Sequence, residues 1–266
     1  MIRPTIARFS LILALGCAAG VPARAAGLLD FETRPDGAAP TDGGRLVNPY
    51  MLEGGGSVRM FFDRNGNNVF DDGVDALPVF ERIGNNGTDG FVATTAGRGL
   101  NDQVREGSGL EDQLGEFFLR QPDGIGVLPG PFVIDYDTDQ VIREFSGEIW
   151  DIDAGADGRF EQWRVDVLDG SGSVLRTLLS PEGVNNLSGL DSLPWTFGFE
   201  GLPDGVRAIR LTFVGTKVDG IGLAFNNFSP TIAVPGSVAV PEPSGLALGA
   251  SAAGLGLAVA FRRRRA

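Results

Sequence analysis

Short apolar runs separated by Gly, Pro, Asn and Asp fill the middle of the chain. A strand with one buried face shows strict alternation of apolar and polar residues. Trp163, Val165 and Val167 alternate in this way with Arg164 and Asp166, which we expect to face solvent. The same pattern predicts strands at Leu28–Glu32, Ser57–Asp63, Phe132–Tyr136, Phe145–Asp153, Glu161–Asp169, Val174–Leu179, Trp195–Glu200, Ile209–Phe213 and Ile221–Phe228. About ten strands at this spacing indicate an all-β body at residues 27–230, an antiparallel β-sandwich of jelly-roll type.

The alternation stops between residue 64 and about residue 114, where Gly, Asn and Asp outnumber apolar residues. We interpret this stretch as a loop-rich insertion that contains a short hairpin near Leu77–Ile83, is ordered by a metal ion, or is mobile. Later in the chain, Asp169–Gly172 is typical of a hairpin turn. Residues 231–240 carry Pro and Gly and predict a linker.

Both ends of the chain carry apolar runs flanked by arginines. Residues 1–26 combine a basic start, a short apolar run and the small-residue site Ala23-Arg24-Ala25, which predicts a cleavable signal helix for the Sec export machinery. Gly245–Phe261 is a run of 17 uncharged residues that spans about 26 Å as a helix, which predicts a transmembrane helix. A buried helix has no reason to end in adjacent cations, whereas a membrane span held on its cytoplasmic side does. The cations here are Arg262, Arg263, Arg264 and Arg265.

Pro241, Glu242, Pro243 and Ser244 precede this apolar run and its arginine cluster. The three parts, at residues 241–266, resemble the PEP-CTERM sorting signal of Gram-negative bacteria. The resemblance implies recognition by exosortase, a membrane-embedded cysteine protease or transpeptidase that cuts near the Pro-Glu-Pro. It also implies anchoring in the inner membrane before processing, then location in the cell envelope or extracellular matrix of bacteria that commonly make exopolysaccharide.

The body has no His, and the one cysteine of the chain, Cys17, lies in the predicted signal peptide. Ser-His-Asp and Cys-His catalysis, disulfides and the preferred ligands of zinc are therefore excluded from the body. Seven of the 22 basic residues lie in the two end segments, so the body is more acidic than the net charge of −12 suggests. Such a surface repels nucleic acid and attracts divalent cations, and its oxygen donors suit calcium.

The first acidic loop places oxygen side chains at alternate positions. Asp63, Asn65, Asn67 and Asp71 occupy positions 1, 3, 5 and 9 of an EF-hand-type loop. Positions 6 and 12 depart from that pattern, because they carry Asn and Val instead of Gly and an acid. The alternatives are a calcium loop of irregular type and a solvated turn, which Asn, Asp and Gly form readily.

The second acidic loop contains Asp151, Asp153, Asp157 and Glu161 within eleven residues. These carboxylates repel one another unless they spread into solvent or gather on a cation, and hard oxygen donors favour calcium. Trp150 directly precedes the loop and is the candidate for stacking on a sugar ring.

The opening Asp30-Phe31-Glu32 and the closing Gly220–Phe228 resemble the ends of galactose-binding-like jelly rolls. In those domains a structural calcium often joins the first and last strands. The resemblance implies calcium ligands among Glu32, Asp219 and Asn226.

No pair of carboxylates is distinguished from the others as a catalytic pair. We therefore expect an exported, non-catalytic protein with a structural or carbohydrate-binding role and structural calcium. Its expected partners are exosortase, the Sec machinery, the membrane through the C-terminal helix, and polysaccharide, but not nucleic acid. The alternative is a polysaccharide hydrolase or lyase that uses a carboxylate pair.

Overall fold

A computed structural model describes residues 28–52, 55–84, 104–105, 107–122, 128–155, 157–184, 190 and 192–233. The strands are β1 (Tyr50–Met51), β2 (Ser57–Phe62), β3 (Val79–Arg82), β4 (Phe117–Arg120), β5 (Phe132–Asp137), β6 (Val141–Trp150), β7 (Trp163–Asp169), β8 (Val174–Leu179), β9 (Pro194–Phe199), β10 (Val206–Phe213) and β11 (Ala224–Ala233). The described residues form no helix, so none there is long and apolar enough to cross a membrane. The all-β class is confirmed. The predicted signal helix, sorting motif, C-terminal helix and arginine cluster lie outside the described residues.

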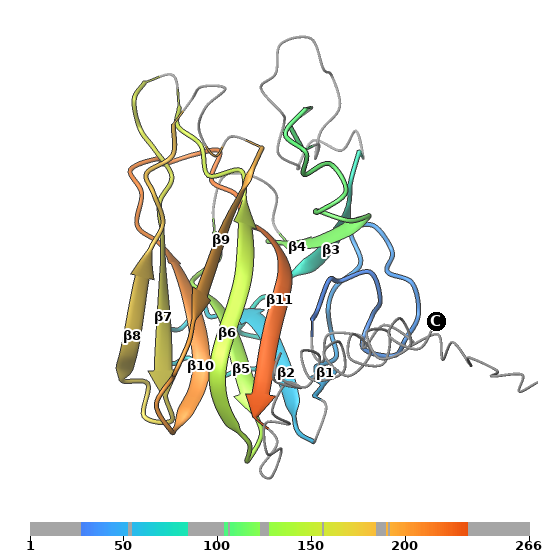
Figure 1. Cartoon of the computed structure of the whole chain (residues 1–266), viewed down its shortest axis with the longest axis vertical. Helices are drawn as coiled ribbons and strands as arrows, with labels where there is room; N and C mark the ends of the chain where they lie inside the picture. The colour runs from blue at the N-terminus through green and yellow to red at the C-terminus, as the bar shows by residue number, and fades with distance from the viewer. Residues whose placement is uncertain are drawn as a thin grey trace, which may run out of the picture.

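The strands form two antiparallel sheets that pack against each other (Figure 1). One sheet has the order β1-β2-β5-β10-β7-β8, and the other has the order β3-β4-β11-β6-β9. Aromatic side chains join the two sheets: the rings of Phe132 and Phe225 have centroids 5.5 Å apart, and those of Tyr136 and Phe228 are 6.2 Å apart. All four rings are buried, so the main hydrophobic core lies between the sheets.

Most predicted strands are confirmed, with ends that differ by a few residues. The β7–β8 pair also confirms the hairpin at Asp169–Gly172. The predicted first strand is wrong: only Leu29 pairs with the last strand, in one bridge to Phe228, and Phe31 adopts a φ of +58° that ends the extended backbone. The last strand continues to Ala233, into the first residues of the expected linker.

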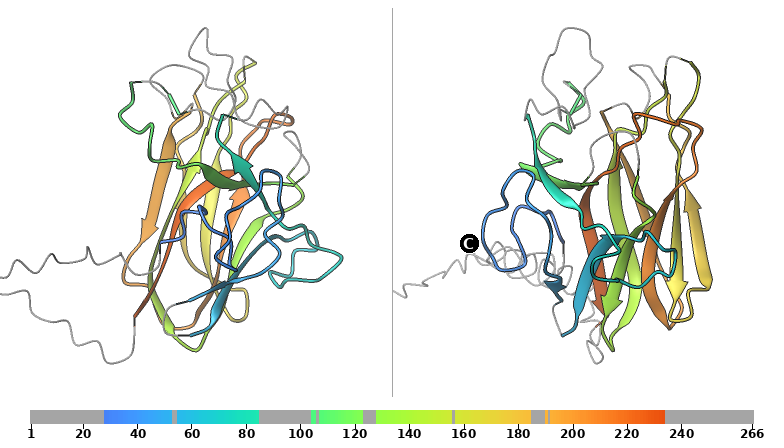
Figure 2. Two further views of the ribbon diagram at one scale, coloured as in Figure 1. Left: turned by 90° about the vertical axis from the view of Figure 1, so that its right-hand side faces the viewer. Right: turned by 180° about the vertical axis from the view of Figure 1, so that it is seen from behind.

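Parts of the predicted insertion cover the outer faces of both sheets. The loop after β2 crosses the six-stranded sheet (Figure 2, right), where Phe70 packs on Phe61, Val133, Leu168 and Ala208. Residues 104–118 contribute Val104, Leu114 and Phe118 to a second cluster on the five-stranded sheet, with Trp150 and Ala224. The described parts of the insertion therefore belong to the folded body and include strand β3.

The covered faces correct one expectation from alternation. Asp166 is only 1% exposed, although it was expected to face solvent. Its carboxylate accepts hydrogen bonds from Arg164, Thr177 and Arg210, and Arg210 also donates to Asn68 of the covering loop. A buried carboxylate requires such partners.

Candidate functional site

A buried polar layer lies on the outer face of the five-stranded sheet, beneath residues 104–117. Glu148 is 6% exposed and accepts hydrogen bonds from three neutral donors. These donors are Gln113 Nε2 at 2.6 Å, Asn227 Nδ2 at 2.9 Å and Trp150 Nε1 at 3.1 Å. The carboxylate therefore anchors the covering segment to β6 and β11.

Asn226 stands beside Glu148 in this layer, because the two residues are partners in the β11–β6 register. Its Nδ2 donates to the carbonyl oxygen of Leu114 at 2.5 Å. Its Oδ1 is buried and has no hydrogen-bond partner among the described residues. An unpaired buried oxygen costs about 1–3 kcal/mol, so this atom requires an explanation such as an ion or a water molecule.

Glu32 reaches the same turn from the N-terminal segment. Its Oε1 accepts hydrogen bonds from the backbone N–H groups of Glu116 at 2.6 Å and Phe117 at 3.1 Å. The turn that binds Glu32 therefore also binds Asn226 through the carbonyl of Leu114. The structure brings these two predicted residues to one turn, where Glu32 Oε1 and the carbonyl of Leu114 accept N–H donors and Asn226 Oδ1 has no partner among the described residues.

Asp219, the third residue of that set, lies elsewhere. It is exposed on the loop between β10 and β11. Within the described part of the chain it forms no hydrogen bond or ion pair with Glu32 or Asn226. Gln113, Asn227 and Glu148 instead complete the polar layer. Sequence analysis did not find these three residues, because alternation along β6 assigns Glu148 to a solvated face.

The first acidic loop is held together by its own N–H groups. Asp63 is 1% exposed, and its two oxygens accept from the backbone N–H groups of Gly66 and Asn68, both at 2.7 Å. Asp71 Oδ2 accepts from the side-chain amides of Asn65 at 2.6 Å and Asn67 at 2.7 Å. Asn65, Asn67 and Asp71 are therefore brought together, whereas Asp63 binds the backbone of the same loop. N–H hydrogens occupy the carboxylate positions that would face an ion.

In the second acidic loop, a lysine supplies the positive charge. Lys217 Nζ lies 2.6 Å from Asp153 Oδ1 and 3.1 Å from Glu161 Oε1. Asp151 instead accepts the backbone N–H of Ser192 at 2.8 Å, and Asp157 pairs with Arg159 at the surface. The four carboxylates therefore have three different partners: Lys217, the backbone of Ser192, and Arg159. Across the described ranges, no group of three or more Asp, Glu, His or Cys side chains is arranged to hold a metal ion.

Trp150 is 1% exposed, and its indole N–H is bound to Glu148. A sugar ring needs an open aromatic face. The Trp150 ring therefore serves the second hydrophobic cluster and is not available for stacking.

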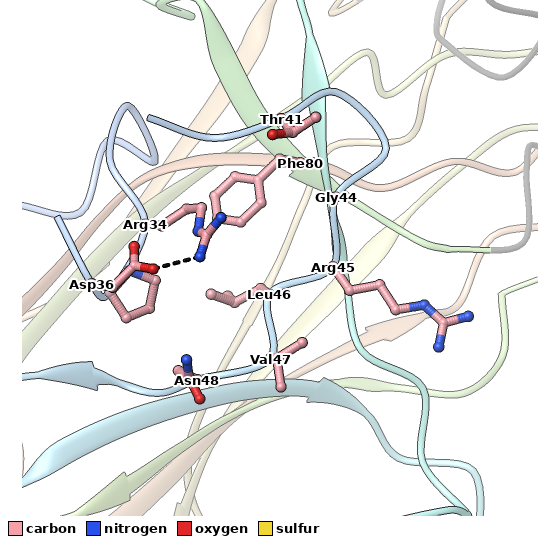
Figure 3. A pocket seen from close by; sticks show the side chains of 10 residues that line it. Arg34, Asp36, Thr41, Gly44, Arg45, Leu46, Val47, Asn48 and Phe80 are labelled. Carbon is pink, nitrogen blue, oxygen red and sulfur yellow. Dashed lines mark hydrogen bonds and ion pairs between the residues drawn. The ribbon is translucent and has the colours of Figure 1, made fainter. Parts of the chain in front are cut away.

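A surface hollow of about 280 Å³ lies where the N-terminal segment passes over β3 (Figure 3). Phe80 and Leu46 form its apolar lining, and an ion pair between Arg34 and Asp36 closes one side. Phe80 is 1% exposed, so it presents little of its ring to solvent. Arg45 extends away from the centre in Figure 3.

No protein-family model matches the chain, and neither does any curated protein. Among solved structures, the chain is similar to the Stig cyclase Fisc from Fischerella sp. TAU, solved with (3Z)-3-(1-methyl-2-pyrrolidinylidene)-3H-indole. The identity is 13% and the TM-score is 0.35, over 76% of this chain and 94% of that one. The adhesin domain of Lys-gingipain from Porphyromonas gingivalis is similar at 10% identity and a TM-score of 0.29, over 64% and 97% of the two chains. At these TM-scores the likenesses carry no argument about function.

Proposed function

We propose that this protein is exported, sorted by exosortase and delivered to the cell envelope or extracellular matrix of a Gram-negative bacterium. The observation that carries the proposal is the order of three sequence features: Pro241–Ser244, the apolar run Gly245–Phe261 and the arginines Arg262–Arg265. The signal peptide predicted at residues 1–26 supports it, because a sorting tail requires a chain that has entered the export pathway.

The body fits a non-catalytic structural or carbohydrate-binding jelly roll. Carboxylates that would be candidates for catalysis are engaged in internal contacts: Glu148 with neutral donors, Asp166 with arginines, and Glu161 with Lys217. These contacts stabilise the fold, so none of these three carboxylates is free to act as one of a pair beside a sugar. This supports a body built for structure or binding.

We propose that the body holds a structural calcium ion at the turn of residues 113–117, beside Asn226. Glu32 and Asn226 would supply side-chain oxygens, and the carbonyl of Leu114 lies beside them. The unpaired Oδ1 of Asn226 is the observation that favours an ion here. A bound ion would fix the N-terminal segment to β11 and so join the two ends of the body.

The sorting proposal is tested on the full chain, expressed in a Gram-negative host with and without an active exosortase. Intact mass and C-terminal peptides are measured on protein from the envelope and from the medium. With exosortase we expect a new C-terminus near Pro241–Ser244, and without it a chain that retains Gly245–Phe261. A matched variant, Pro241→Ala with Pro243→Ala, should behave like the host without exosortase. A retained tail in all cases would contradict the proposal.

The role of the body is tested with the same recovered protein. A glycan array measures binding, and release of reducing ends from the bound polysaccharide measures hydrolysis. Binding without release supports the proposed role. Release of reducing ends that depends on a pair of carboxylates would establish the hydrolase alternative instead.

A further inference from the structure

Lys217 and two acids meet at one end of the body, where three loops come together. The Nζ atom of Lys217 lies 2.6 Å from Asp153 Oδ1 and 3.1 Å from Glu161 Oε1. The side chain of Lys217 is 11% exposed and that of Glu161 is 3% exposed. The ammonium group of Lys217 therefore contacts two carboxylates, of which Glu161 is buried and Asp153 is 25% exposed.

We propose that Lys217 and Asp153 form an intramolecular isopeptide bond, with Glu161 as the group that transfers the proton. First, one proton passes from the ammonium group to the carboxylate, which gives an amine and a carboxylic acid. The lysine nitrogen then attacks Cγ of Asp153. A C–N bond forms, a C–O bond breaks, and the oxygen leaves as water with two of the three ammonium protons. The amide is neutral, and no oxidant or other reactant is consumed.

Glu161 is placed to serve this step. A protonated carboxyl group can accept a proton from the attacking nitrogen on one oxygen and release another proton to the leaving oxygen. Burial raises the pKa of Glu161 well above its ordinary value, which favours the protonated form. Burial lowers the pKa of Lys217, but the attraction and hydrogen bonds of ionised Glu161 and Asp153 outweigh it and the pKa is raised. Once Glu161 is protonated its charge attraction is lost, and Asp153 alone holds the ammonium form. The initial proton transfer to Asp153 is therefore required before attack.

Backbone contacts fix the three groups relative to one another. The N–H of Glu161 donates to the carbonyl of Asp153 at 2.8 Å, and the N–H of Gly183 donates to the carbonyl of Glu161 at 2.8 Å. The N–H of Lys217 donates to Phe160 at 3.1 Å. A Cβ at Gly183 would lie 1.9 Å from the carbonyl oxygen of Asp153, so only glycine permits this approach. Such pre-positioning converts an encounter into an intramolecular reaction.

The bond would have a clear structural effect. Asp153 follows β6 of the five-stranded sheet, and Lys217 follows β10 of the six-stranded sheet. The two residues are 64 positions apart, so the bond would close a long loop and tie one sheet to the other. The only cysteine of the chain is Cys17, so a disulfide cannot provide such a link in the body.

The test is a tryptic peptide map and mass measurement of the full chain. We expect a covalent pair of peptides that contain Asp153 and Lys217, lighter than their sum by one water molecule, with no cleavage after Lys217. Fragmentation should place the amide on Asp153. Unlinked peptides of full mass, or an amide placed on Glu161, would overturn the proposal.

Variants separate the roles of the three residues. Lys217→Arg keeps the positive charge but cannot form this amide, so its peptides should be unlinked and of full mass. Glu161→Gln should lose the link or form it much more slowly. Asp153→Asn should still form it with ammonia as the leaving group, which gives a product identical in mass to the linked wild-type protein. A linked peptide pair in Lys217→Arg would contradict the assignment, whether or not Glu161→Gln folds.

Discussion

The proposed calcium site predicts that substitution of Asn226 abolishes the stabilisation of the body by calcium. In Asn226→Leu, the carbonyl of Leu114 loses its hydrogen bond from Nδ2, which costs about 1–3 kcal/mol. The same substitution removes the unpaired Oδ1, whose burial costs a similar amount. In a chelator, the two effects oppose each other, and the melting temperatures of wild type and variant should differ little.

In the presence of calcium, the melting temperatures of the wild type and the variant should differ. An ion that binds only the folded state stabilises it by about 2.7 kcal/mol at 100 times its Kd. For a body of this size, about 2–4 °C per kcal/mol gives a rise in Tm of roughly 5–11 °C for the wild type. Asn226→Leu should show no rise. The difference between the two calcium-induced shifts is the diagnostic quantity, because it cancels effects of the substitution that are independent of calcium.

The assay is differential scanning calorimetry of the full chain in calcium and in chelator. Asp71→Asn in the first acidic loop and Asp157→Asn in the second are matched controls, and both should keep the full shift. An equal shift in Asn226→Leu would place the ion elsewhere, and loss of the shift in Asp71→Asn would place it in the first loop. If millimolar calcium leaves the Tm of the wild type unchanged, the proposed calcium site is refuted.

Three further predictions concern the body. Phe228→Ala should lower the free energy of unfolding by about 3–5 kcal/mol in urea titrations, because its buried ring packs on Tyr136 of one sheet and Phe145 of the other. The control Val218→Ala, at a 65% exposed position, should change it by less than about 0.5 kcal/mol. Burial raises the pKa of Asp135 despite Arg207, so its stabilising contribution is present at low pH and is lost as pH rises above 3.8 through its folded-state pKa. Asp135→Asn should remove that loss, measured as urea midpoints against pH, and an unchanged pH profile would contradict it. Glu148→Gln should lower the free energy of unfolding by about 1–3 kcal/mol in urea, because an NH2 group replaces an oxygen that accepts hydrogen bonds. An unchanged urea midpoint would show that Glu148 does not anchor the segment that covers the five-stranded sheet.

Local pattern predicted the strands well wherever one face of a strand enters the core. Trp163, Val165 and Val167 alternate and are all buried. Strand β4 lacked that signal, because its first three residues, Phe117–Leu119, are all buried and the strand is only four residues long. A run that is apolar on both faces shows no period of two, so alternation does not tell whether it forms a strand or a helix.

The residues of the candidate site were harder to predict, because their partners are distant in sequence. Lys217 meets Asp153 from 64 residues away, so the second acidic loop looked like four unpaired carboxylates. Glu148 and Asp166 have the spacing of exposed strand positions, yet both are covered. Alternation reports which side of a strand faces away from the core, but it cannot report what another segment places on that side.

The first acidic loop, which resembles a calcium motif, also covers the outer face of the six-stranded sheet. The outer face of the six-stranded sheet presents Phe61 and Val133, which would be exposed without a cover. Phe70 supplies that cover: its ring meets Phe61 edge to face at 5.5 Å, and the guanidinium of Arg59 lies 4.7 Å from its centroid. The hydrogen bonds around Asp63 and Asp71 hold the loop in the shape that delivers Phe70. Burial of an apolar face is therefore sufficient reason for an Asp- and Asn-rich loop at this position, whether or not an ion binds there.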